Sequence, residues 1–495
     1  MGAGGGLSGM RRPACRAASG ILVLALAGCA VGPNYQRPQV PVPEGFYGDA
    51  RAAEARSFAD APWWDVFADP ILKGLVDEAI RNGFDARLAA ARVEEARARF
   101  GIARSELFPA VDYGGSWQRG RANRFFDPTG EAQTAWTANV SFSWELDLWG
   151  RIRRLNESAR AQYLATEEAR RGVLLSLVSD VAITYMDLRE LDDELAIARR
   201  TTDAFQGTYD LFNRRLEGGA ASALETSRAE ASLGQVASEI PEIERAIVAR
   251  ENHINFLLGR NPQPIPREGP LMAVPPEVPP GLPSTLLERR PDVRQAEQLV
   301  IAANANVGVA KADFFPRLSL TGLFGGISPE LGDLFSHNKV WNIAAGLTGP
   351  IFQGGRIKRS YEAAQAQWDQ ARIEYQAAAA NAFGEVSQAL VDRTKLVETE
   401  RQRARTVDAY REAVRLANIR YNSGLSAYFE VLEAQQQLFP AEISLARTRR
   451  DQLVAVVNLY RALGGGWQAQ EKAEPPQSKS SSLQSLRPPS DVQKP

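Results

Sequence analysis

The stretch Gly101-Ile-Ala-Arg-Ser-Glu-Leu-Phe-Pro109 occurs twice, because Gly308-Val-Ala-Lys-Ala-Asp-Phe-Phe-Pro316 repeats its pattern 207 residues later. A separation that stays almost constant along the chain indicates internal duplication. The sequence therefore predicts two related halves that differ by a two-residue insertion or deletion between Pro109 and Trp136. Further pairs are all 205 residues apart: Trp136 and Trp341, Gly150-Arg151 and Gly355-Arg356, Gly219 and Gly424, Glu225 and Glu430, Leu258-Gly259 and Leu463-Gly464.

Each half is predicted to follow the order helix, strand pair, very long helix, helix. Residues 69–106 place apolar side chains at steps of three and four, the period of a helix. Phe108-Pro109 closes that helix, because proline disfavours the helical region for the residue before it. In the second half, a heptad seam from Ile357 to Ala382 predicts a helix over about 353–421, roughly 100 Å long at 1.5 Å per residue.

Glycines mark the ends of these helices. Gly219 and Gly424 are expected to stop the long helices at turns. Helices of about 35 residues then return to Gly259 and Gly464. Each half would thus contain a long helical hairpin.

Between the helices lie segments with the two-residue period of β-strands. Trp136–Leu146 alternates strictly over eleven residues, the length and pattern of a transmembrane strand. Val111–Gly120 alternates more loosely, and Leu318–Phe324 and Trp341–Leu347 repeat the pair. A half-buried hairpin of a soluble protein remains the alternative. Four tryptophans on these segments would anchor a barrel at the lipid–water boundary: Trp117, Trp136, Trp144 and Trp341.

The N-terminus has the features of an export signal. Three arginines precede the apolar run Ile21–Ala27, which is too short to span a bilayer as a helix. The run ends in Leu26-Ala-Gly-Cys29, which resembles a lipobox, so Cys29 is expected to carry covalent lipid and to begin the mature chain. Ala30, where an Asp would suggest retention in the inner membrane, favours the outer membrane. A plain secretory signal with a free cysteine is the alternative.

The composition excludes several classes of protein. Among 495 residues, 58 Lys and Arg nearly cancel 59 Asp and Glu, and no basic run suggests a nucleic-acid surface. Only 2 His and 2 Cys occur, too few for a Cys/His metal cluster. His253 and His337 lie in no catalytic motif, and no glycine-rich phosphate loop with a lysine is present. We therefore expect no enzyme, no metal and no cofactor besides the covalent lipid.

These patterns divide the chain into six predicted segments. The joint between the halves is dense in proline, and the C-terminal end is rich in Pro, Ser, Gln and Lys, which predicts disorder. The segments are a lipoprotein signal peptide (1–28), an N-terminal anchor segment (29–68), the first repeat (69–260), a Pro-rich linker (261–284), the second repeat (285–467) and a disordered tail (468–495).

Five motifs follow one another along the chain: Cys29-Ala-Val-Gly-Pro-Asn-Tyr-Gln-Arg-Pro38, Trp63-Trp64 before Asp69-Pro70, Leu287-Glu-Arg-Arg-Pro-Asp-Val-Arg-Gln-Ala-Glu297, Ala310-Lys-Ala-Asp-Phe-Phe-Pro316 and Asn458-Leu-Tyr-Arg-Ala-Leu-Gly-Gly-Gly-Trp467. In this order they resemble the TolC family of outer-membrane efflux channels, in its OprM/NodT-like lipoprotein branch. The resemblance implies a homotrimer with a shared outer-membrane β-barrel, a long α-helical periplasmic barrel, and docking to a periplasmic adaptor and an inner-membrane pump of the resistance-nodulation-division type.

An argument from the strands also demands more than one copy. Four transmembrane strands cannot close, because bacterial barrels start at eight strands and an open edge in lipid leaves backbone groups unpaired. The number three comes from the resemblance. A structural or adaptor coiled-coil lipoprotein without a pore remains the alternative, although it leaves the alternating strands unexplained.

The resemblance also suggests a periplasmic gate after the second turn. Glu430 and Glu433 match positions that are normally Asp in the family and that line the constricted entrance, so this chain departs by one methylene at both. Glu225, the first-half counterpart of Glu430, and the nearby Arg228 are expected to help hold the closed state. Solvated charges at a helix start, favoured there by the helix dipole, are the alternative.

Overall fold

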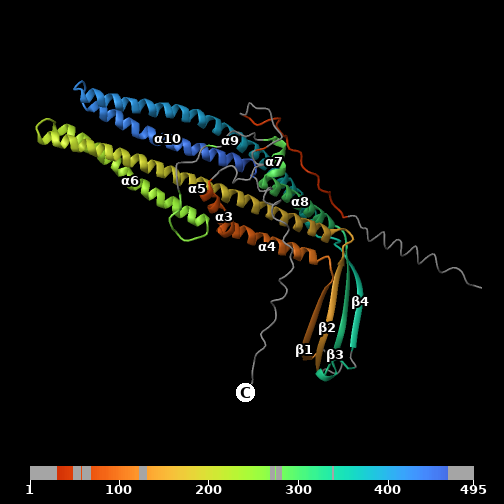
Figure 1. The fold of residues 1–495 in the computed structure, drawn as a ribbon. Helices are drawn as coiled ribbons and strands as arrows, with labels where there is room; N and C mark the ends of the chain where they lie inside the picture. Colours follow the sequence, from red (N-terminus) through yellow and green to blue (C-terminus); the bar gives the residue numbers. More distant parts are fainter. Residues whose placement is uncertain are drawn as a thin grey trace, which may run out of the picture. The chain divides into compact units, whose positions relative to one another are not determined.

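The structure is a computed structural model that describes residues 30–47, 57, 69–121, 131–267, 274, 281–336 and 339–465. Helices and strands follow in the order that the sequence predicts for each half (Figure 1). The elements are α3 (Pro70–Asn82), α4 (Phe84–Ser105), β1 (Ala110–Arg121), β2 (Ala132–Leu146), α5 (Arg151–Glu217), α6 (Ala223–Leu257), α7 (Pro283–Arg289), α8 (Pro291–Ala312), β3 (Arg317–Ser328), the short 3₁₀ helix η2 (Leu331–Asp333), β4 (Lys339–Thr348), α9 (Arg356–Asn422) and α10 (Phe429–Ala462).

The order of the elements and several of their lengths confirm the predicted duplication, although β2 has 15 residues and β4 has 10. Helices α5 and α9 each have 67 residues, α4 and α8 each have 22, and β1 and β3 each have 12. The backbone angles are duplicated as well, since Gly219 and Gly424 both have φ of 71°. That left-handed conformation is accessible to glycine without strain, so the two glycines end the two long helices in the same way.

The helix predicted over 69–106 is interrupted at Gly83 and forms two helices, α3 and α4. Asp69 caps the first, because its carboxylate accepts hydrogen bonds from the backbone N–H groups of Ile71 and Leu72. A Cβ atom at Gly83 would lie 2.7 Å from the carbonyl oxygen of Leu257 on α6. The same Cβ would lie 2.4 Å from the carbonyl oxygen of Ala79, so both the end of α3 and the distant α6 favour glycine at this break.

The described residues fall into two compact units that do not coincide with the two halves of the sequence. The first unit combines Met1–Pro41, Leu88–Arg170 and Pro291–Asn381, and the second combines Val42–Arg87, Arg171–Arg290 and Ala382–Pro495. Both halves thus contribute to each unit. The long helices α5 and α9 continue from the first unit into the second.

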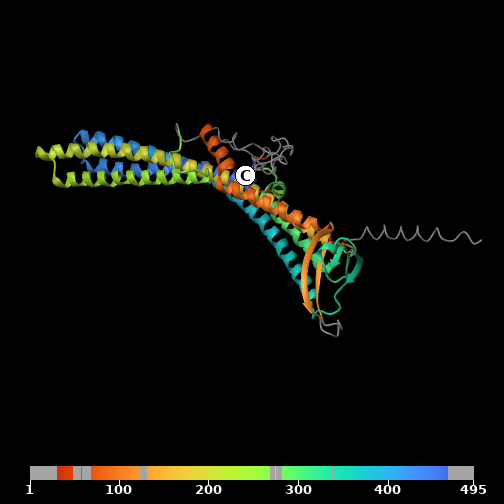
Figure 2. The ribbon, with the colours of Figure 1, turned by 90° about the horizontal axis from the view of Figure 1, so that it is seen from below.

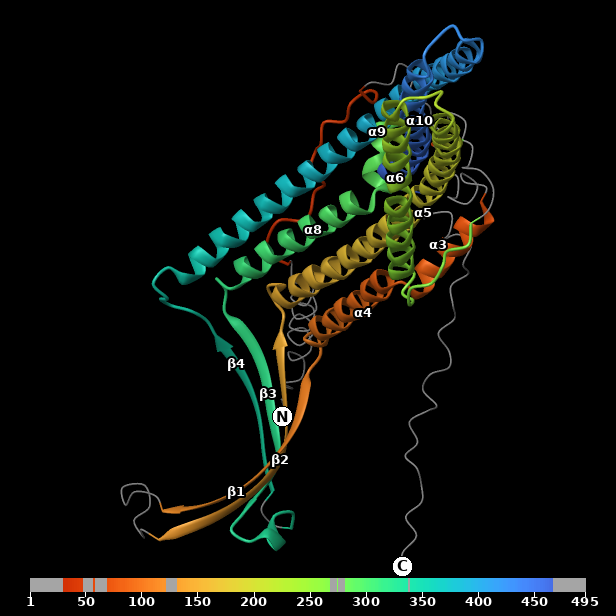
Figure 3. The same cartoon turned by 90° about the vertical axis from the view of Figure 1, so that its left-hand side faces the viewer.

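In the first unit, the strands form one antiparallel sheet in the order β1-β2-β3-β4. Helices α4, α5, α8 and α9 lie side by side in the same order (Figure 3). The heptad seam predicted on the second long helix is buried in this unit at Ala364, Ala371 and Tyr375. Strands and helices of the first unit are therefore both ordered along the duplication.

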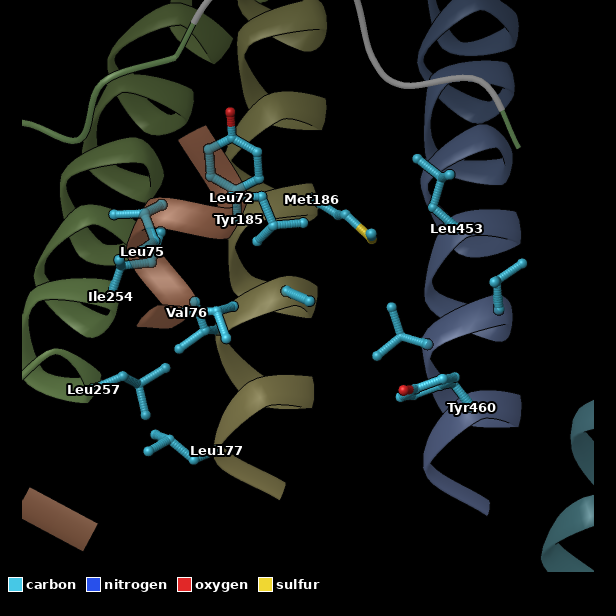
Figure 4. Packing of buried hydrophobic residues seen from close by; sticks show 14 of the residues in the cluster. Leu72, Leu75, Val76, Leu177, Tyr185, Met186, Ile254, Leu257, Leu453 and Tyr460 are labelled. Carbon is cyan, nitrogen blue, oxygen red and sulfur yellow. The ribbon is translucent and has the colours of Figure 1, made fainter. Parts of the chain in front are cut away.

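In the second unit, helices α5, α6, α9 and α10 run alongside one another (Figures 1 and 2). Helix α3 inserts Leu72 and Val76, both fully buried, into the core between them (Figure 4). Burial of one such side chain contributes about 1.5–3 kcal/mol.

Among the residues that the structure describes, no helix has the length and apolar character needed to cross a membrane.

Candidate functional site

The ends of the two long helices form two turns of matching backbone geometry. The N–H of Ala220 donates to the carbonyl oxygen of Arg215 over 2.7 Å, and the N–H of Leu425 donates to that of Arg420 over 2.9 Å. In both turns a left-handed glycine redirects the chain into the returning helix. The candidate gate residues lie just beyond these turns, in the first residues of α6 and α10.

An aromatic cluster joins the two helical hairpins beneath the turns. The ring of Tyr428 lies 4.7 Å from that of Phe212 on α5 and 5.1 Å from that of Tyr421 on α9, both edge to face. Its hydroxyl forms a hydrogen bond of 2.7 Å with the hydroxyl of Thr208. Burial raises the pKa of the Tyr428 hydroxyl, so the neutral form is held in the cluster. The two turns are thereby held close to each other.

The four candidate gate residues are exposed and have different surroundings. The Glu430 carboxylate pairs with Arg420 at 3.3 Å. Glu225 instead completes a capping box with Ser222: its carboxylate accepts from the backbone N–H of Ser222 at 2.9 Å, and the Ser222 hydroxyl oxygen accepts from the Glu225 N–H. Glu433 forms no ion pair within the described part of the chain. Glu430 and Glu433 on α10 therefore differ in their contacts, since only Glu430 has an arginine partner among the described residues.

Arg228 connects the starts of the two returning helices. Its guanidinium group lies 5.6 Å from the centre of the Phe429 ring, a cation–π contact between α6 and the first residue of α10. This contact places Arg228 beside the residue that precedes Glu430 in the chain. Its role in a closed state stays a prediction.

Sequence reasoning missed several residues of this region. Arg215 on α5 donates a hydrogen bond to the hydroxyl of Tyr421 on α9 and lies over its ring at 5.3 Å. Gln436 on α10 donates to the hydroxyl of Ser232 on α6 at 2.9 Å. The concentration of tyrosine on either side of Gly424 was the available signal, since buried tyrosines need hydrogen-bond partners.

One face of the sheet in the first unit is mainly apolar across all four strands, apart from the charged residues Arg119, Arg121 and Lys339 near one end. The strand registers place Tyr113, Val140, Phe324 and Trp341 in one row across the sheet. Trp117 and Trp136 oppose each other in β1 and β2, with ring centres 6.0 Å apart, and Trp144 lies on the same face of β2. The four tryptophans singled out in the sequence therefore share one face.

The opposite face of the sheet is mainly polar. It consists of Ser, Thr, Asn, Gln, Gly, Arg, Asp and Glu, apart from six apolar residues. The sheet is therefore amphipathic. The six exceptions are Ala110, Ala135, Leu323, Ile327, Val340 and Ala344.

The chain just after Cys29 is fixed to the junction of strands and helices. Cys29 itself lies outside the described residues, but the N–H of Val31 donates to the carbonyl oxygen of Trp149 at 3.0 Å. Farther along, Arg37 pairs with Glu297 of α8 at 2.8 Å. The indole ring of Trp149 stacks on Phe315 at 4.6 Å. These contacts tie the N-terminal segment to the base of the sheet.

The described residues offer no group of three or more His, Cys, Asp and Glu side chains that could hold a metal ion.

An amphipathic sheet with two outer edges, continuous with long helical hairpins, defines a subunit of an outer-membrane channel. The comparisons with known proteins agree with this class.

The family model described as "Outer membrane efflux protein" matches twice, over residues 75–260 and 282–465. The chain belongs to this family, and it is an outer-membrane component of an efflux system. The antibiotic efflux pump outer membrane protein ArpC of Pseudomonas putida is 36% identical over 460 residues, 90% of this chain and 94% of ArpC. The toluene efflux pump outer membrane protein TtgC of the same species has the same identity and coverage. The open-state MtrE outer membrane channel of Neisseria gonorrhoeae matches with a TM-score of 0.79 and 31% identity, over 88% of this chain and 98% of MtrE.

Proposed function

We propose that three copies of this chain form one closed channel in the outer membrane, each contributing four strands to a shared barrel. The observation that carries the proposal is the apolar face that crosses the whole sheet, combined with the outer edges of β1 and β4. In lipid, each unpaired backbone group at such an edge costs several kcal/mol, so closure requires further copies. The number three follows from the resemblance to the TolC family.

The spacing of the tryptophans supports this placement in the membrane. Trp136 and Trp144 lie eight residues apart on the same face of β2, which is about 26 Å at roughly 3.3 Å per residue. The apolar band of an outer-membrane barrel is about 25 Å tall between its aromatic girdles. The two residues would thus lie near opposite boundaries, with Val140 close to the middle of the bilayer.

We propose that the channel gives passive exit to small molecules delivered by an inner-membrane pump of the resistance-nodulation-division type through a periplasmic adaptor. The chain is equally similar to relatives named for antibiotic and for toluene efflux, 36% in each case. Similarity to these relatives therefore does not assign a particular cargo to this chain.

The periplasmic entrance would be controlled at the two turns. In a ring of copies, the exposed Glu430 and Glu433 become rings of carboxylates, which attract cations and repel anions. Opening would separate the Arg228–Phe429 contact between the two returning helices and the Arg420–Glu430 ion pair across the second turn. At its other end the chain would be anchored by lipid on Cys29, next to the tethered Val31.

Single-channel recording in planar bilayers tests the proposal. The purified protein should give cation-preferring channels that a trivalent cation blocks from the periplasmic side only. The Glu430→Gln, Glu433→Gln double variant should lose both the preference and the sided block. Glu412→Gln, which changes an exposed carboxylate on α9 away from the turn, is the matched control and should behave as the wild type.

Two outcomes would contradict the proposal. Folded, membrane-inserted protein without conductance would favour a coiled-coil lipoprotein that has no pore. A double variant with wild-type selectivity and block would remove the acidic gate. Anchoring is tested separately: Cys29→Ala should lose metabolic palmitate label, and a fully labelled variant would place the lipid elsewhere.

A further inference from the structure

We propose that Arg119, Arg121 and Lys339 form a binding site for a phosphorylated glycolipid of the outer leaflet of the membrane. The three residues lie at the loop-side end of the sheet, where β1 connects to β2 and β3 connects to β4, away from the helices (Figure 3). This site rests on the proposed channel, because it takes the apolar face of the sheet as the face toward lipid. It goes beyond the channel by assigning a ligand to the outer surface of the barrel.

The charged residues of the four strands are unevenly distributed. All three on the apolar face are basic and lie at the loop-side end: Arg119, Arg121 and Lys339. The other three are of both signs and lie on the polar face, near the end joined to the helices: Asp112, Glu145 and Arg317. A charge on a lipid-facing strand is costly at mid-bilayer and is tolerated near the interfaces. The positions of the three basic residues therefore fit the headgroup layer, and their sign fits an anionic headgroup.

Tryptophans mark the boundary that the basic residues cross. On β1, Arg119 and Arg121 follow Trp117 by two and four residues on the same face, and on β4, Lys339 precedes Trp341 by two. Two residues correspond to about 7 Å at roughly 3.3 Å per residue. Because tryptophan rings of membrane barrels lie at the level of the headgroups, each basic group reaches the headgroup layer from the water side of its ring.

The duplication relates the levels of the two hairpins. Trp117 lies opposite Trp136 in β1 and β2, and their counterparts Phe324 and Trp341 lie opposite each other in β3 and β4. Two hairpins with different sequences thus have the same register. The basic residues of β1 and of β4 therefore lie beyond the same boundary, at the same side of the bilayer.

The three basic side chains are exposed and available to a ligand. Within the described ranges, none of them forms an ion pair or a side-chain hydrogen bond. The adjacent rings are exposed as well, 56% for Trp117 and 72% for Trp341. The described acidic residues of this end lie outside the strands: Glu131, Glu330 and Asp333.

The chemistry of these groups matches phosphates carried above acyl chains. The guanidinium group of an arginine binds two phosphate oxygens at once, and the ammonium group of a lysine adds a compact positive charge. The exposed tryptophan rings offer apolar surface to the chains directly below. In the proposed barrel β4 of one copy neighbours β1 of another, so Lys339 of one copy and the two arginines of the other serve one ligand.

Titration of the full-length protein in an uncharged detergent with purified, bisphosphorylated lipid A tests the proposal. Native mass spectrometry counts the lipid bound to the multimer. We expect the wild type to bind this lipid about tenfold more tightly than the same lipid without its phosphates. The Arg119→Gln, Arg121→Gln, Lys339→Gln triple variant should bind about 100-fold more weakly, because each basic side chain near an anionic lipid surface contributes about fivefold.

A charge-matched variant controls for net charge. Arg92→Gln, Arg401→Gln, Arg405→Gln removes three positive charges from exposed helix positions and should bind as the wild type does. If the first triple variant does not assemble, Arg121→Gln and Lys339→Gln alone should each weaken binding about fivefold.

Three results would overturn the site. The first is equal binding of the two lipids by the wild type, and the second is wild-type binding by the Arg119, Arg121 and Lys339 variants. The third is displacement of the lipid by inorganic phosphate, which would make the free ion the ligand.

Single-channel recording of the same samples separates the lipid site from the proposed function. Conducting multimers whose lipid binding ignores the three basic residues would refute the site and leave the channel proposal intact. Wild-type protein that neither assembles nor conducts would refute both.

Discussion

The two turns have the same backbone but use equivalent side chains differently. Arg215 and Arg420 are counterparts in the duplication, yet Arg215 reaches across to Tyr421 in the other half, whereas Arg420 pairs with Glu430 in its own half. The following glutamates differ in the same way. Glu225 caps its helix through Ser222, and Glu430 forms the ion pair with Arg420.

One residue difference accounts for the two uses of glutamate. The position of Ser222 is occupied by Ala427 in the second half, and α10 begins without a side-chain cap. With no hydroxyl at this position, the capping box cannot form, and the Glu430 carboxylate is available to Arg420. Duplicated backbone geometry therefore does not guarantee duplicated chemistry, and the turns became asymmetric while the strand registers stayed identical.

The largest expected effect tests whether the two halves of the sheet are equivalent. Val140→Arg and its counterpart Ala345→Arg place a charge on the apolar face near mid-bilayer, which costs about 2–4 kcal/mol per copy. Asn139→Arg and Ala344→Arg, on the polar face, should cost little. Urea unfolding in lipid vesicles, with the amount of assembled multimer, measures both. Tolerance of Ala345→Arg alone would show that the halves of the sheet face different surroundings.

A second asymmetry lies in the long helices. Glu190 of α5 is buried beside Glu194, and the carboxylate of Glu194 pairs with Arg447 of α10 at 2.6 Å. The counterpart of Glu190 in the second half, Lys395 on α9, is exposed. Burial, followed by the hydrogen bond and the negative charge of Glu194, raises the pKa of Glu190 to about 8.

The sign of the pH dependence follows from this shift. The folded state binds the Glu190 proton more tightly than the unfolded state, so this contribution to the free energy of unfolding falls as pH rises from about 4.5 to about 8. Glu190→Gln should remove that fall and stabilise the protein at pH 8 by about 1–3 kcal/mol, the range for a buried polar group whose hydrogen bonding is restored. Lys395→Gln is the control and should leave the pH profile unchanged. Thermal unfolding across pH measures the effect, and an unaltered profile in Glu190→Gln would contradict the assignment.

The third expected effect is the loss of the capping box. Ser222→Ala should destabilise the first turn of α6 by about 1 kcal/mol. Hydrogen exchange of the amides following Ser222 should then accelerate about fivefold, since about 1.4 kcal/mol corresponds to tenfold. Ser227→Ala, an exposed change inside the same helix, is the control. Exchange at the start of α10 should not change in either variant. If Ser222→Ala and Ser227→Ala accelerate exchange at the start of α6 equally, the cap contributes nothing specific.

The fold could be predicted largely because it is written in periodic patterns. The separation of 205 residues predicts the duplication. The alternation of Trp136–Leu146 and the heptads after Ile357 predict a strand and a long helix, and the structure has both. The helix break at Gly83 was missed, although a glycine after the last buried residues of α3 was an available signal for a helix end. The division into two units was missed because a repeat in the sequence need not be a unit of packing.

The candidate site was predicted in position more than in contacts. The sequence places Glu225 and Glu430 after equivalent turns, where the structure has them. The contacts depend on whether Ser222 or Ala427 precedes the glutamate and on how far the arginine side chain extends across the turn. These features decide that Glu225 caps its helix and that Glu430 pairs with Arg420. Glu190 was not distinguished from solvated helix charges, because burial between α5 and α10 is a property of the packed bundle.

The smallest expected effect tests the explanation of the asymmetry itself. Ala427→Ser restores the hydroxyl that the second half lacks, so it should draw Glu430 into a capping box and away from Arg420. The backbone is already suitable, because the N–H of Glu430 donates to the carbonyl oxygen of Ala427 at 3.2 Å, as the N–H of Glu225 does to that of Ser222 at 3.1 Å. A double-mutant cycle of Arg420→Ala and Glu430→Gln should give a coupling energy of about 0.2–1 kcal/mol in the wild type, the range for exposed ion pairs. In the Ala427→Ser background the coupling should fall toward zero while exchange at the start of α10 slows. The contradicting outcome is an unchanged coupling energy in the Ala427→Ser variant together with slower exchange of its α10 amides. Glu430 would then bind Arg420 and the new hydroxyl at once, and Ser222 would not explain the difference between the turns.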